Sequence, residues 1–311
     1  MALTIGVDVG GTKIAAGVVD ESGTIIDEAR RETPAQQPSE IIEAIADVVR
    51  EVTDRHEIVG VGVGAAGFIG SDRATVLFAP NLAWRDVPLR EQLESQLDLP
   101  VVVENDVNAA AWGEFRFGSA ADSHDLLMVA VGTGVGGGIV VDGELVRGAF
   151  GIAAEIGHLR VVPAGLLCGC GQRGCWEQYA SGRALVRMAR EQVTEGEALL
   201  VAAGGDPAEI DGESITRLAQ QGDELSRSLL AELGRWLGEG IASLAAVLDP
   251  GLVVVGGGVA EAEDLLMVPL RTAFDSSLPA TDNRPHLKLR TADLGNEAAI
   301  IGAAELARSR R

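Results

Sequence analysis

Three cysteines and one histidine lie close together in the second half of the chain. Cys168, Cys170 and Cys175 are the only cysteines in the sequence, and His158 lies ten residues before the first of them. Three thiolates and one imidazole can close a tetrahedral Zn²⁺ site, and the glycines between the cysteines suit a tight metal-binding turn. The spacing therefore predicts a structural zinc site. The alternatives are a disulfide, which the odd number of cysteines and a reducing compartment would disfavour, and buried free thiols.

Two glutamates flank the segment from Cys168 to Cys175, which we call the zinc knuckle. Glu155 lies three residues before His158, and Glu177 lies two residues after Cys175. A metal ion would hold both carboxylates and the imidazole near one another, and carboxylates are good hydrogen-bond acceptors for the hydroxyls of a neutral sugar. We therefore interpret Glu155, His158 and Glu177 as sugar contacts. Either glutamate could instead be a solvated surface residue, as most glutamates are.

A further group of polar residues follows an apolar run. Residues 101–103 are all valine and predict a strand, Glu104-Asn105-Asp106 comes next, and residues 108–114 predict the first turns of a helix. An acid at the end of a strand can accept a proton from a substrate hydroxyl while an adjacent amide holds the substrate. We therefore predict that Asp106 is a general base and that Asn105 and Asp106 contact the sugar. The alternative is that Asp106 only caps the following helix.

Glycine-rich turns follow three apolar runs. Backbone N–H groups at such turns can bind phosphate oxygens, a threonine hydroxyl adds a donor, and an acid at the end of the preceding strand could hold Mg²⁺ through water. Three turns of this kind predict a nucleotide site. Its predicted residues are Asp8, Gly10, Gly11, Thr12, Lys13, Thr133, Gly134, Gly256 and Gly257.

Two familiar nucleotide-binding motifs do not fit these turns. The segments 62–67 and 132–137 match the G-x-G-x-x-G pattern of dinucleotide-binding folds, but neither is followed by the helix that such a site requires. The P-loop pattern G-x-x-x-x-G-K-[ST] does not occur in the sequence. An ordinary glycine-rich hairpin remains an alternative for the first turn taken alone.

Strand patterns alternate with helix patterns along the chain. The residues Ile41, Ile45, Val48, Val49 and Val52 share one helical face, and a longer apolar face runs from Leu225 to Leu244. That longer helix should end at Asp249-Pro250, and residues 252–255 then predict a buried strand. Residues 191–213 predict an exposed connection with a short helix around residues 198–203. The alternation predicts an α/β fold, and 311 residues favour two domains with a cleft between them.

Composition excludes several classes of protein. The formal net charge of −21 disfavours nucleic acid and anionic membranes as partners, because both bind basic surfaces. Hydrophobic residues make up 47% of the chain, but no apolar run reaches the 18 or so residues of a membrane span. The N-terminal residues resemble a strand and not a secretion signal. We therefore expect a soluble cytoplasmic protein.

The motifs together resemble those of the ROK family (repressors, open reading frames and kinases), over essentially the whole chain. The residues that carry the resemblance, which is greatest to the bacterial glucokinases, are Asp8 to Lys13, Glu104 to Asp106, Gly132 to Gly138, Glu155 to His158 and Cys168 to Glu177. The resemblance implies a two-domain actin-like ATPase (ribonuclease H-like) sugar kinase fold with ATP bound across the domains. It also implies Asp106 as base, Zn²⁺ on His158 and the three cysteines, and sugar held by Asn105, Asp106, Glu155, His158 and Glu177. Gly67 and Asn81 correspond to residues near the sugar.

The resemblance sets approximate domain limits and a function. Residues 1–105 would form the smaller domain, with a C-terminal helix at 297–311 returning to it, and residues 106–296 would form the larger domain with the zinc knuckle. The implied activity is phosphorylation of glucose to glucose 6-phosphate by ATP and Mg²⁺. A homodimer or tetramer is expected.

Several alternatives to glucose phosphorylation stay open at this point. The acceptor could be N-acetylmannosamine, N-acetylglucosamine, mannose or fructose, and polyphosphate could replace ATP as the donor. A sugar-responsive transcription repressor of the same family would need a DNA-binding module. The first phosphate turn begins within ten residues of Met1, which leaves no room there for a helix-turn-helix, and the charge is adverse. We therefore expect an enzyme.

Overall fold

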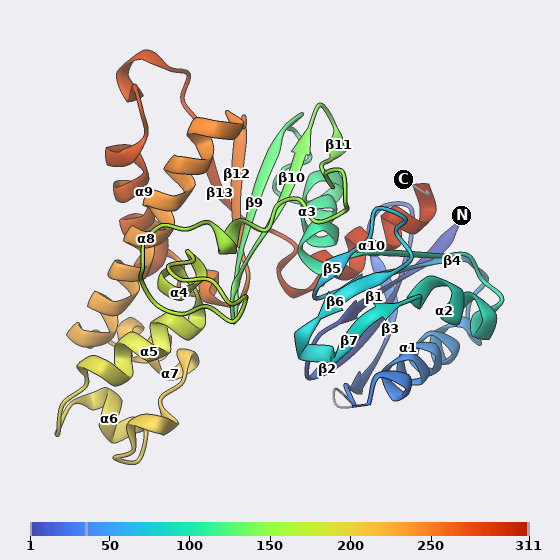
Figure 1. Cartoon of the computed structure of the whole chain (residues 1–311), viewed down its shortest axis with the longest axis horizontal. Coiled ribbons are helices and arrows are strands. Elements are labelled where there is room, and N and C mark those ends of the chain that lie inside the picture. Colours follow the sequence, from blue (N-terminus) through green and yellow to red (C-terminus); the bar gives the residue numbers. More distant parts are fainter. Residues whose placement is uncertain (1, 35–36, 310–311) are drawn as a thin grey trace. The chain divides into compact units, whose positions relative to one another are not determined.

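The computed structural model describes residues 2–34 and 37–309, and these form two compact units (Figure 1). Unit 1 comprises the described residues within 1–128, 137–154 and 292–311, and unit 2 comprises residues 129–136 and 155–291. The predicted domain limits at residues 105 and 297 stay a prediction, and residues 310 and 311 of the predicted C-terminal helix lie outside the described residues.

A five-stranded sheet forms the centre of unit 1. Its strand order is β3-β2-β1-β4-β8. Strand β2 is antiparallel to both of its neighbours, β1 and β3, whereas β4 and β8 run parallel to β1. A smaller antiparallel sheet, β5-β6-β7, lies in the same unit. The strands are β1 (Leu3–Val9), β2 (Lys13–Val19), β3 (Ile25–Glu32), β4 (Ile58–Ala65), β5 (Phe68–Ile69), β6 (Val76–Ala79), β7 (Trp84–Val87) and β8 (Val101–Asn105).

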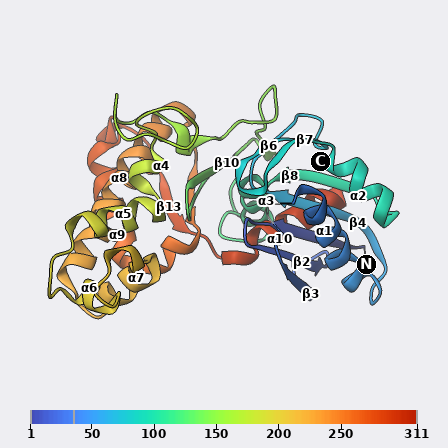
Figure 2. The ribbon, with the colours of Figure 1, turned by 60° about the horizontal axis from the view of Figure 1, so that its bottom comes forward.

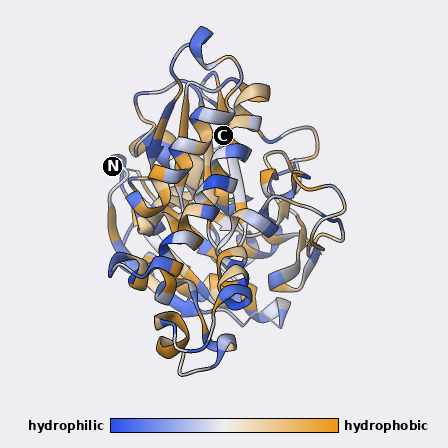
Figure 3. Ribbon diagram, turned by 90° about the vertical axis from the view of Figure 1, so that its left-hand side faces the viewer, coloured by the Kyte–Doolittle hydropathy of each residue, from blue (hydrophilic) through white to orange (hydrophobic). Residues whose placement is uncertain are grey.

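Alternating side chains of the central strand β1 separate two packing layers. Ile5, Val7 and Val9 are fully buried in a core that also contains the apolar face of helix α1 (Pro38–Thr53) and residues of helix α2 (Leu89–Leu97). Gly6 points to the opposite face, where helix α10 (Ala298–Ser309) runs along β1 and β4 (Figures 1 and 2). In Figure 3 the helices show orange and blue segments in alternation along their length, as amphipathic helices do.

Glycines let α10 approach its neighbours closely. A Cβ atom on Gly6 of β1 would overlap the carbonyl group of Ile300, and one on Gly62 of β4 would overlap that of Ala303. Helix α3 (Asp106–Phe117) is equally close, because a Cβ atom on Gly302 would overlap the carbonyl oxygen of Ala109. Backbone atoms therefore form these contacts directly, without side chains between them.

A second five-stranded sheet has the order β11-β10-β9-β12-β13. If the five strands of each sheet are numbered by their order in the sequence, both sheets have the strand order 3-2-1-4-5. The division between the units passes through β9 and β10. The strands are β9 (Leu126–Val131), β10 (Val135–Val141), β11 (Glu144–Leu145), β12 (Leu252–Gly256) and β13 (Lys288–Thr291).

Helices make up most of unit 2. The longest, α8, packs along α9, and α5 and α7 also contact it. Asp223 caps the start of α8 by accepting a hydrogen bond from the backbone N–H of Ser226, and Asp249 ends the helix with a left-handed φ of 44°. The helices are α4 (Glu177–Ala180), α5 (Gly182–Gln192), α6 (Ala198–Ala202), α7 (Gly212–Gln220), α8 (Glu224–Leu248) and α9 (Asp264–Ser277).

The sequence-based expectations for the α/β class and for these elements are confirmed. The predicted strand at 252–255 is β12, the predicted short helix at 198–203 is α6, and the predicted helix end at residue 249 is the end of α8. One boundary was wrong: helix α3 begins at Asp106 and not at residue 108. Among the described residues, no helix combines the length and apolar character needed to cross a membrane.

Replacement of Gly302 by Ala should destabilise the protein. Alanine is favoured over glycine inside a helix by about 1 kcal/mol, but the added Cβ would overlap the backbone oxygen of Ala109, which cannot move without shifting α3. We expect a net loss of about 1–3 kcal/mol in the free energy of unfolding, measured by urea denaturation. Gly212→Ala is the matched control, because a Cβ on this helical glycine meets no atom within 4 Å. Equal stability of the two variants would contradict the packing described here.

Candidate functional site

In unit 1, polar residues gather at the carboxyl ends of three parallel strands. Asp8 of β1 lies in register with Gly64 of β4, which lies in register with Glu104 of β8. Asn105 and Asp106 follow directly at the end of β8. Ligands of open α/β sheets bind at the carboxyl ends of strands, so this edge is the candidate substrate site of unit 1.

Asn105, and not Asp106, caps helix α3. Its side-chain oxygen accepts hydrogen bonds from the backbone N–H groups of Val107 (2.9 Å) and Asn108 (3.0 Å). Its amide nitrogen donates to the carbonyl oxygen of Gly67 at 3.2 Å. The alternative in which Asp106 serves only as the helix cap was therefore wrong, because Asn105 occupies that position. Asp106 is the first residue of the helix, and the residue as a whole is half-buried while protein atoms surround its carboxyl group.

Burial shapes the titration of both acids at this edge. Burial raises the pKa of the Asp106 carboxyl above its ordinary value, while hydrogen bonds from the backbone of Val107 and Asp106 and from Asn105 act in the opposite direction. Burial and the nearby Asp106 raise the pKa of Asp8 to about 6, and Lys13 partly offsets this. A carboxylate with a raised pKa is a stronger base than an exposed aspartate, as proton abstraction requires.

The first predicted phosphate turn joins β1 to β2. The backbone N–H of Gly10 donates to the carbonyl oxygen of Lys13 at 3.0 Å, which closes the turn. Thr33 holds it from the side, because its hydroxyl donates to the carbonyl oxygen of Gly10 at 2.8 Å and its backbone N–H donates to that of Thr12 at 3.0 Å. Thr12 and Lys13 are exposed. Both side chains are therefore accessible to a ligand, which fits the predicted phosphate contacts.

The second predicted phosphate turn joins β9 to β10 and belongs to unit 2. The backbone N–H of Gly132 donates to the carbonyl oxygen of Gly134 at 3.0 Å. The carbonyl oxygen of Gly132 in turn accepts from the N–H of Gly182, at the start of α5, at 2.8 Å. The third turn follows β12, where Gly257 has a φ of 87° and approaches the backbone of Val131. The predicted second and third nucleotide turns thus lie beside each other.

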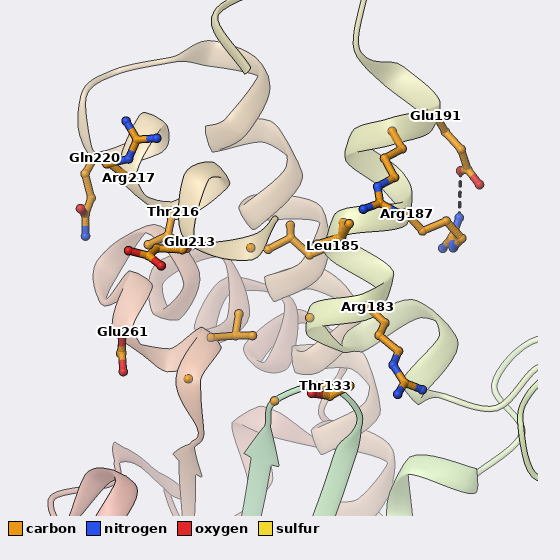
Figure 4. Close-up of a pocket in the computed structure, with 17 residues that line it drawn as sticks. Thr133, Arg183, Leu185, Arg187, Glu191, Glu213, Thr216, Arg217, Gln220 and Glu261 are labelled. Carbon is orange, nitrogen blue, oxygen red and sulfur yellow. Dashed lines mark hydrogen bonds and ion pairs between the residues drawn. The ribbon is translucent and has the colours of Figure 1, made fainter. Parts of the chain in front are cut away.

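A pocket of about 1230 Å³ in unit 2 contains both turns (Figure 4). The two turns and the residues after them contribute Gly132, Thr133, Gly258, Val259 and Glu261, and helices α5 and α7 contribute the other lining residues. Figure 4 shows the side chain of Arg183 directed toward the turn that carries Thr133. The size of this pocket suits a nucleotide.

The arginines of this pocket were not predicted from the sequence. Arg183, Arg187 and Arg190 lie on one face of α5, and Arg217 comes from α7. Arg187 is paired with Glu191 at 2.8 Å, and Arg190 donates to the carbonyl oxygens of Ala208 and Ile210. A spacing of four and then three residues places side chains on one helical face, so this pattern could have indicated a basic face in an otherwise acidic chain.

The four predicted zinc ligands come together in unit 2. One ligand atom from each of His158, Cys168, Cys170 and Cys175 lies within 4.8 Å of all the others. The sulfurs of Cys170 and Cys175 are 3.6 Å apart, and Nδ1 of His158 is 3.7 Å from the sulfur of Cys168. A tetrahedral ion with Zn–S bonds of about 2.3 Å separates neighbouring sulfurs by about 3.8 Å. The donor set and its spacing therefore fit a zinc ion.

Burial disfavours the charged thiolate form of two of these cysteines, and a bound cation would favour it. Cys168 and Cys175 are buried, and burial is the main cause that raises the pKa of both thiols. Zinc binds thiolates, so ligation has to remove these protons, and the charge of the ion favours their loss. The exposed Cys170 lies at the outer side of the cluster.

Trp176 anchors the zinc knuckle to helix α8. Its ring is fully buried, its indole N–H donates to the carbonyl oxygen of Trp236 at 2.8 Å, and a Cβ atom on Gly240 would overlap it. Its backbone N–H donates to the carbonyl oxygen of Leu159 at 2.7 Å, which joins the knuckle to the segment of His158. The sequence reasoning missed this anchor, although a tryptophan directly after the last cysteine was the available signal.

Of the three predicted sugar contacts in unit 2, His158 is itself a predicted zinc ligand, and Glu155 and Glu177 each contact a predicted ligand. Oε1 of Glu177 lies 2.9 Å from the sulfur of Cys168 and 3.8 Å from Nδ1 of His158. Glu177 also lies against the second phosphate turn, because a Cβ atom on Gly134 would be 2.9 Å from its Oε2. Glu155 precedes the short 3₁₀ helix Ile156–His158, and its carbonyl oxygen accepts from the N–H of His158 at 3.1 Å.

Comparisons with known proteins identify relatives over nearly the whole chain. The model of the ROK family matches residues 4–310. Glucokinase from Streptomyces coelicolor is 50% identical over 312 residues, which is 99% of this chain and 98% of that protein. A solved ROK family glucokinase from Streptomyces griseus, in complex with glucose and AMPPNP, is 50% identical with a TM-score of 0.92 and covers 99% and 100% of the two chains. A more distant relative, N-acetylmannosamine kinase from Escherichia fergusonii, is 36% identical over 99% of both chains.

The metal cluster leads to a prediction about composition and stability. We expect one tightly bound Zn²⁺ per purified chain, and Cys170→Ala should abolish it because three ligands hold the ion poorly. Gln172→Ala is the control, since it alters the knuckle but leaves all four ligands in place. Elemental analysis and thermal melting should show zinc and stability lost together in the first variant and kept in the second. A stable, fully active protein with well under one zinc per chain would refute the site.

Proposed function

The chain belongs to the ROK family, and we propose that it is a kinase that transfers the terminal phosphoryl group of ATP to the 6-hydroxyl of glucose. The observation that carries this proposal is the likeness over the full chain to the Streptomyces griseus glucokinase in complex with glucose and AMPPNP, an ATP analogue. The alternatives for the acceptor are N-acetylmannosamine, N-acetylglucosamine, mannose and fructose. The greater likeness to proteins named glucokinase favours glucose.

Asp106 is the proposed general base. Its carboxylate accepts the proton of the 6-hydroxyl as that oxygen forms a bond to the γ-phosphorus, while the bond from this phosphorus to the β,γ-bridging oxygen breaks and ADP leaves. The position of Asp106 at the carboxyl edge of the sheet and its raised pKa both support this role. Asn105, whose amide fixes the first turn of α3, would hold the sugar beside it.

The proposed nucleotide contacts are the three glycine-rich turns. The pocket of unit 2 would receive the nucleotide, because Thr133 and Arg183 line it together with Gly132 and Gly258 (Figure 4). Gly134, Gly256 and Gly257 belong to the two turns at this pocket and are the other proposed contacts in unit 2. In unit 1, the proposed contacts are Asp8, Gly10, Gly11, Thr12 and Lys13. Mg²⁺ supplies positive charge to the phosphates when bound, and Asp8 is the residue proposed to hold it through water.

Zinc would have a structural role in this proposal. With four protein ligands the ion has no open position for water or substrate. Its proposed effect is to fix His158 and Glu177, which with Glu155 would contact the sugar. The cytoplasmic location and the dimer or tetramer expected from the sequence stay predictions.

The choice of acceptor and donor can be tested directly. The purified protein should phosphorylate glucose with ATP more efficiently, measured as kcat/KM, than it phosphorylates N-acetylmannosamine, N-acetylglucosamine, mannose or fructose. Polyphosphate in place of ATP should give a lower rate. If another hexose has a higher kcat/KM, that hexose and not glucose is the preferred substrate. If no hexose is phosphorylated, the kinase proposal is overturned.

Asp106→Asn should lower kcat by about 10²- to 10⁴-fold, the usual contribution of a positioned base. ATP binding, measured by calorimetry, should change little, because the proposed nucleotide contacts do not include Asp106. The wild-type rate should also fall on acidification, since a protonated Asp106 cannot accept a proton. Because burial raises the pKa of Asp106, this loss should begin at a higher pH than for an ordinary aspartate, whose pKa is 3.8. A variant that keeps more than half of the wild-type kcat would remove Asp106 from this role.

A further inference from the structure

A buried carboxylate stands directly before the two residues proposed to act on the sugar. Glu104 is the fourth residue of β8, and its side chain is only 3% exposed. Its Oε2 lies 2.6 Å from Nε of Arg147 and 3.7 Å from Nε of Arg73. A buried charge is costly unless it is paired, so the two arginines are what allows a carboxylate at this position.

The two arginines come from segments that are far apart in the sequence. Arg73 lies in the turn between β5 and β6, and Arg147 follows β11. Both arginines belong to unit 1 together with Glu104. The carboxylate therefore ties two irregular segments to the end of β8. The contact with Arg147 is short and charge-assisted, and such bonds are about twice as strong as neutral ones.

The second oxygen of Glu104 acts on the residues around Asp106. Oε1 accepts a hydrogen bond from the backbone N–H of Asn105 at 3.1 Å and one from the side-chain amide of Asn108 at 3.2 Å. Asn108 is 1% exposed, and its own backbone N–H is held by Asn105. Glu104, Asn105 and Asn108 thus form a closed network around the backbone of Asp106.

The cluster carries more positive than negative charge. Arg73 is mostly buried, and burial together with the charge of Arg147 lowers its pKa to about 10, while Glu104 acts in the opposite direction. Within residues 2–34 and 37–309, Nη2 of Arg73 has no hydrogen-bond acceptor in reach. Oε2 of Glu104 lies against both arginines, so this carboxylate offsets part of the positive charge of Arg73 and Arg147 beside β8.

We propose that Glu104 is a positioning residue for phosphoryl transfer: held by Arg147 and Arg73, its carboxylate fixes the backbone of Asn105 and Asp106 so that the base points at the sugar hydroxyl. This inference rests on the proposed function. A displacement of a reacting group by about 1 Å can lower a rate by about 100-fold, so a network of this kind has a direct effect on turnover.

Glu104→Gln tests the proposal because it keeps the size of the side chain and removes its charge. In the wild-type protein one carboxylate oxygen accepts from Arg147 and the other from Asn105. The glutamine amide has a single oxygen, so it can accept from only one of these two sides and places its N–H groups against the other. We expect kcat for glucose to fall by about 10- to 100-fold while the affinity for ATP, measured by calorimetry, stays within about twofold. Arg147→Met should give a similar loss, and the double variant should lose less than the product of the two single effects.

Glu114→Gln is the matched control for the cost of altering any buried glutamate. Glu114 is fully buried in the same helix α3 and accepts hydrogen bonds from Ser119, Asp293 and Leu294, which lie outside the Asp106 network. This variant should unfold more easily, yet its folded fraction should keep the wild-type kcat. If Glu104→Gln behaves in the same way, with stability lost and kcat kept, Glu104 has only a structural role and the proposal is overturned.

The remaining outcomes separate this inference from the proposed function. If the wild-type protein does not phosphorylate glucose or another hexose, the proposed function itself fails. If the wild-type protein is active and both Glu104→Gln and Arg147→Met keep more than half of the wild-type kcat, only the positioning role fails. Should Glu104→Gln not fold, Arg147→Met decides alone, because that side chain is 21% exposed and its loss should be tolerated better.

Discussion

Parallel pairing of β1, β4 and β8 is the constraint on which the candidate site of unit 1 depends. The register places Asp8, Gly64 and Glu104 in one row, so the two acids are separated by a glycine. A Cβ atom at Gly64 would lie 3.5 Å from the Cα atom of Asp106, so the absence of a side chain at Gly64 leaves space beside Asp106, the proposed base. Burial first, and then repulsion from the nearby Asp106, raise the pKa of Asp8 at this edge. A slip of one residue in this pairing would turn these groups to the other face of the sheet.

The same strand order occurs twice in the chain, and the glycine-rich turns occupy equivalent places in both sheets. The turn Gly10–Thr12 joins the first two strands of one sheet, and the turn Gly132–Gly134 joins the first two strands of the other. The fourth strand ends near Gly64 in the first sheet and at Gly256 in the second. Function therefore resides in loops placed by a repeated framework, which explains why one framework serves kinases that act on different sugars.

Many of the helices and strands and the cysteine cluster could be predicted from residue patterns, because they depend on residues that are close together in the sequence. Apolar periodicity gave α1, α8 and β12, and the cysteine spacing gave a cluster whose atoms do meet. The repeated topology could not be predicted, because strand order depends on pairings between distant segments and no repeat is evident in the sequence itself. Glu104 and Glu114 were missed for a related reason: an acid looks solvated in a sequence, and only tertiary structure brings Arg147 or the N–H groups of Asp293 and Leu294 to it. The cap at Asn105 was a local feature, but Asp106 is an equally good capping residue, so propensity alone could not choose between them.

The discontinuity of unit 1 has a consequence for how the protein is made. Helix α10 is the last helix of the described residues, yet it packs directly on β1, which is synthesised long before it. Until α10 is synthesised, the face of the sheet that bears Gly6, Gly17 and Gly62 has no cover from it, and Ala15 and Val19 lack the contact with Ile300 and Ala304. Such nascent apolar surface is what chaperones bind. A chain that lacks α10 would therefore keep this face of the sheet uncovered by it, so unit 1 can be completed only after α10 has been synthesised.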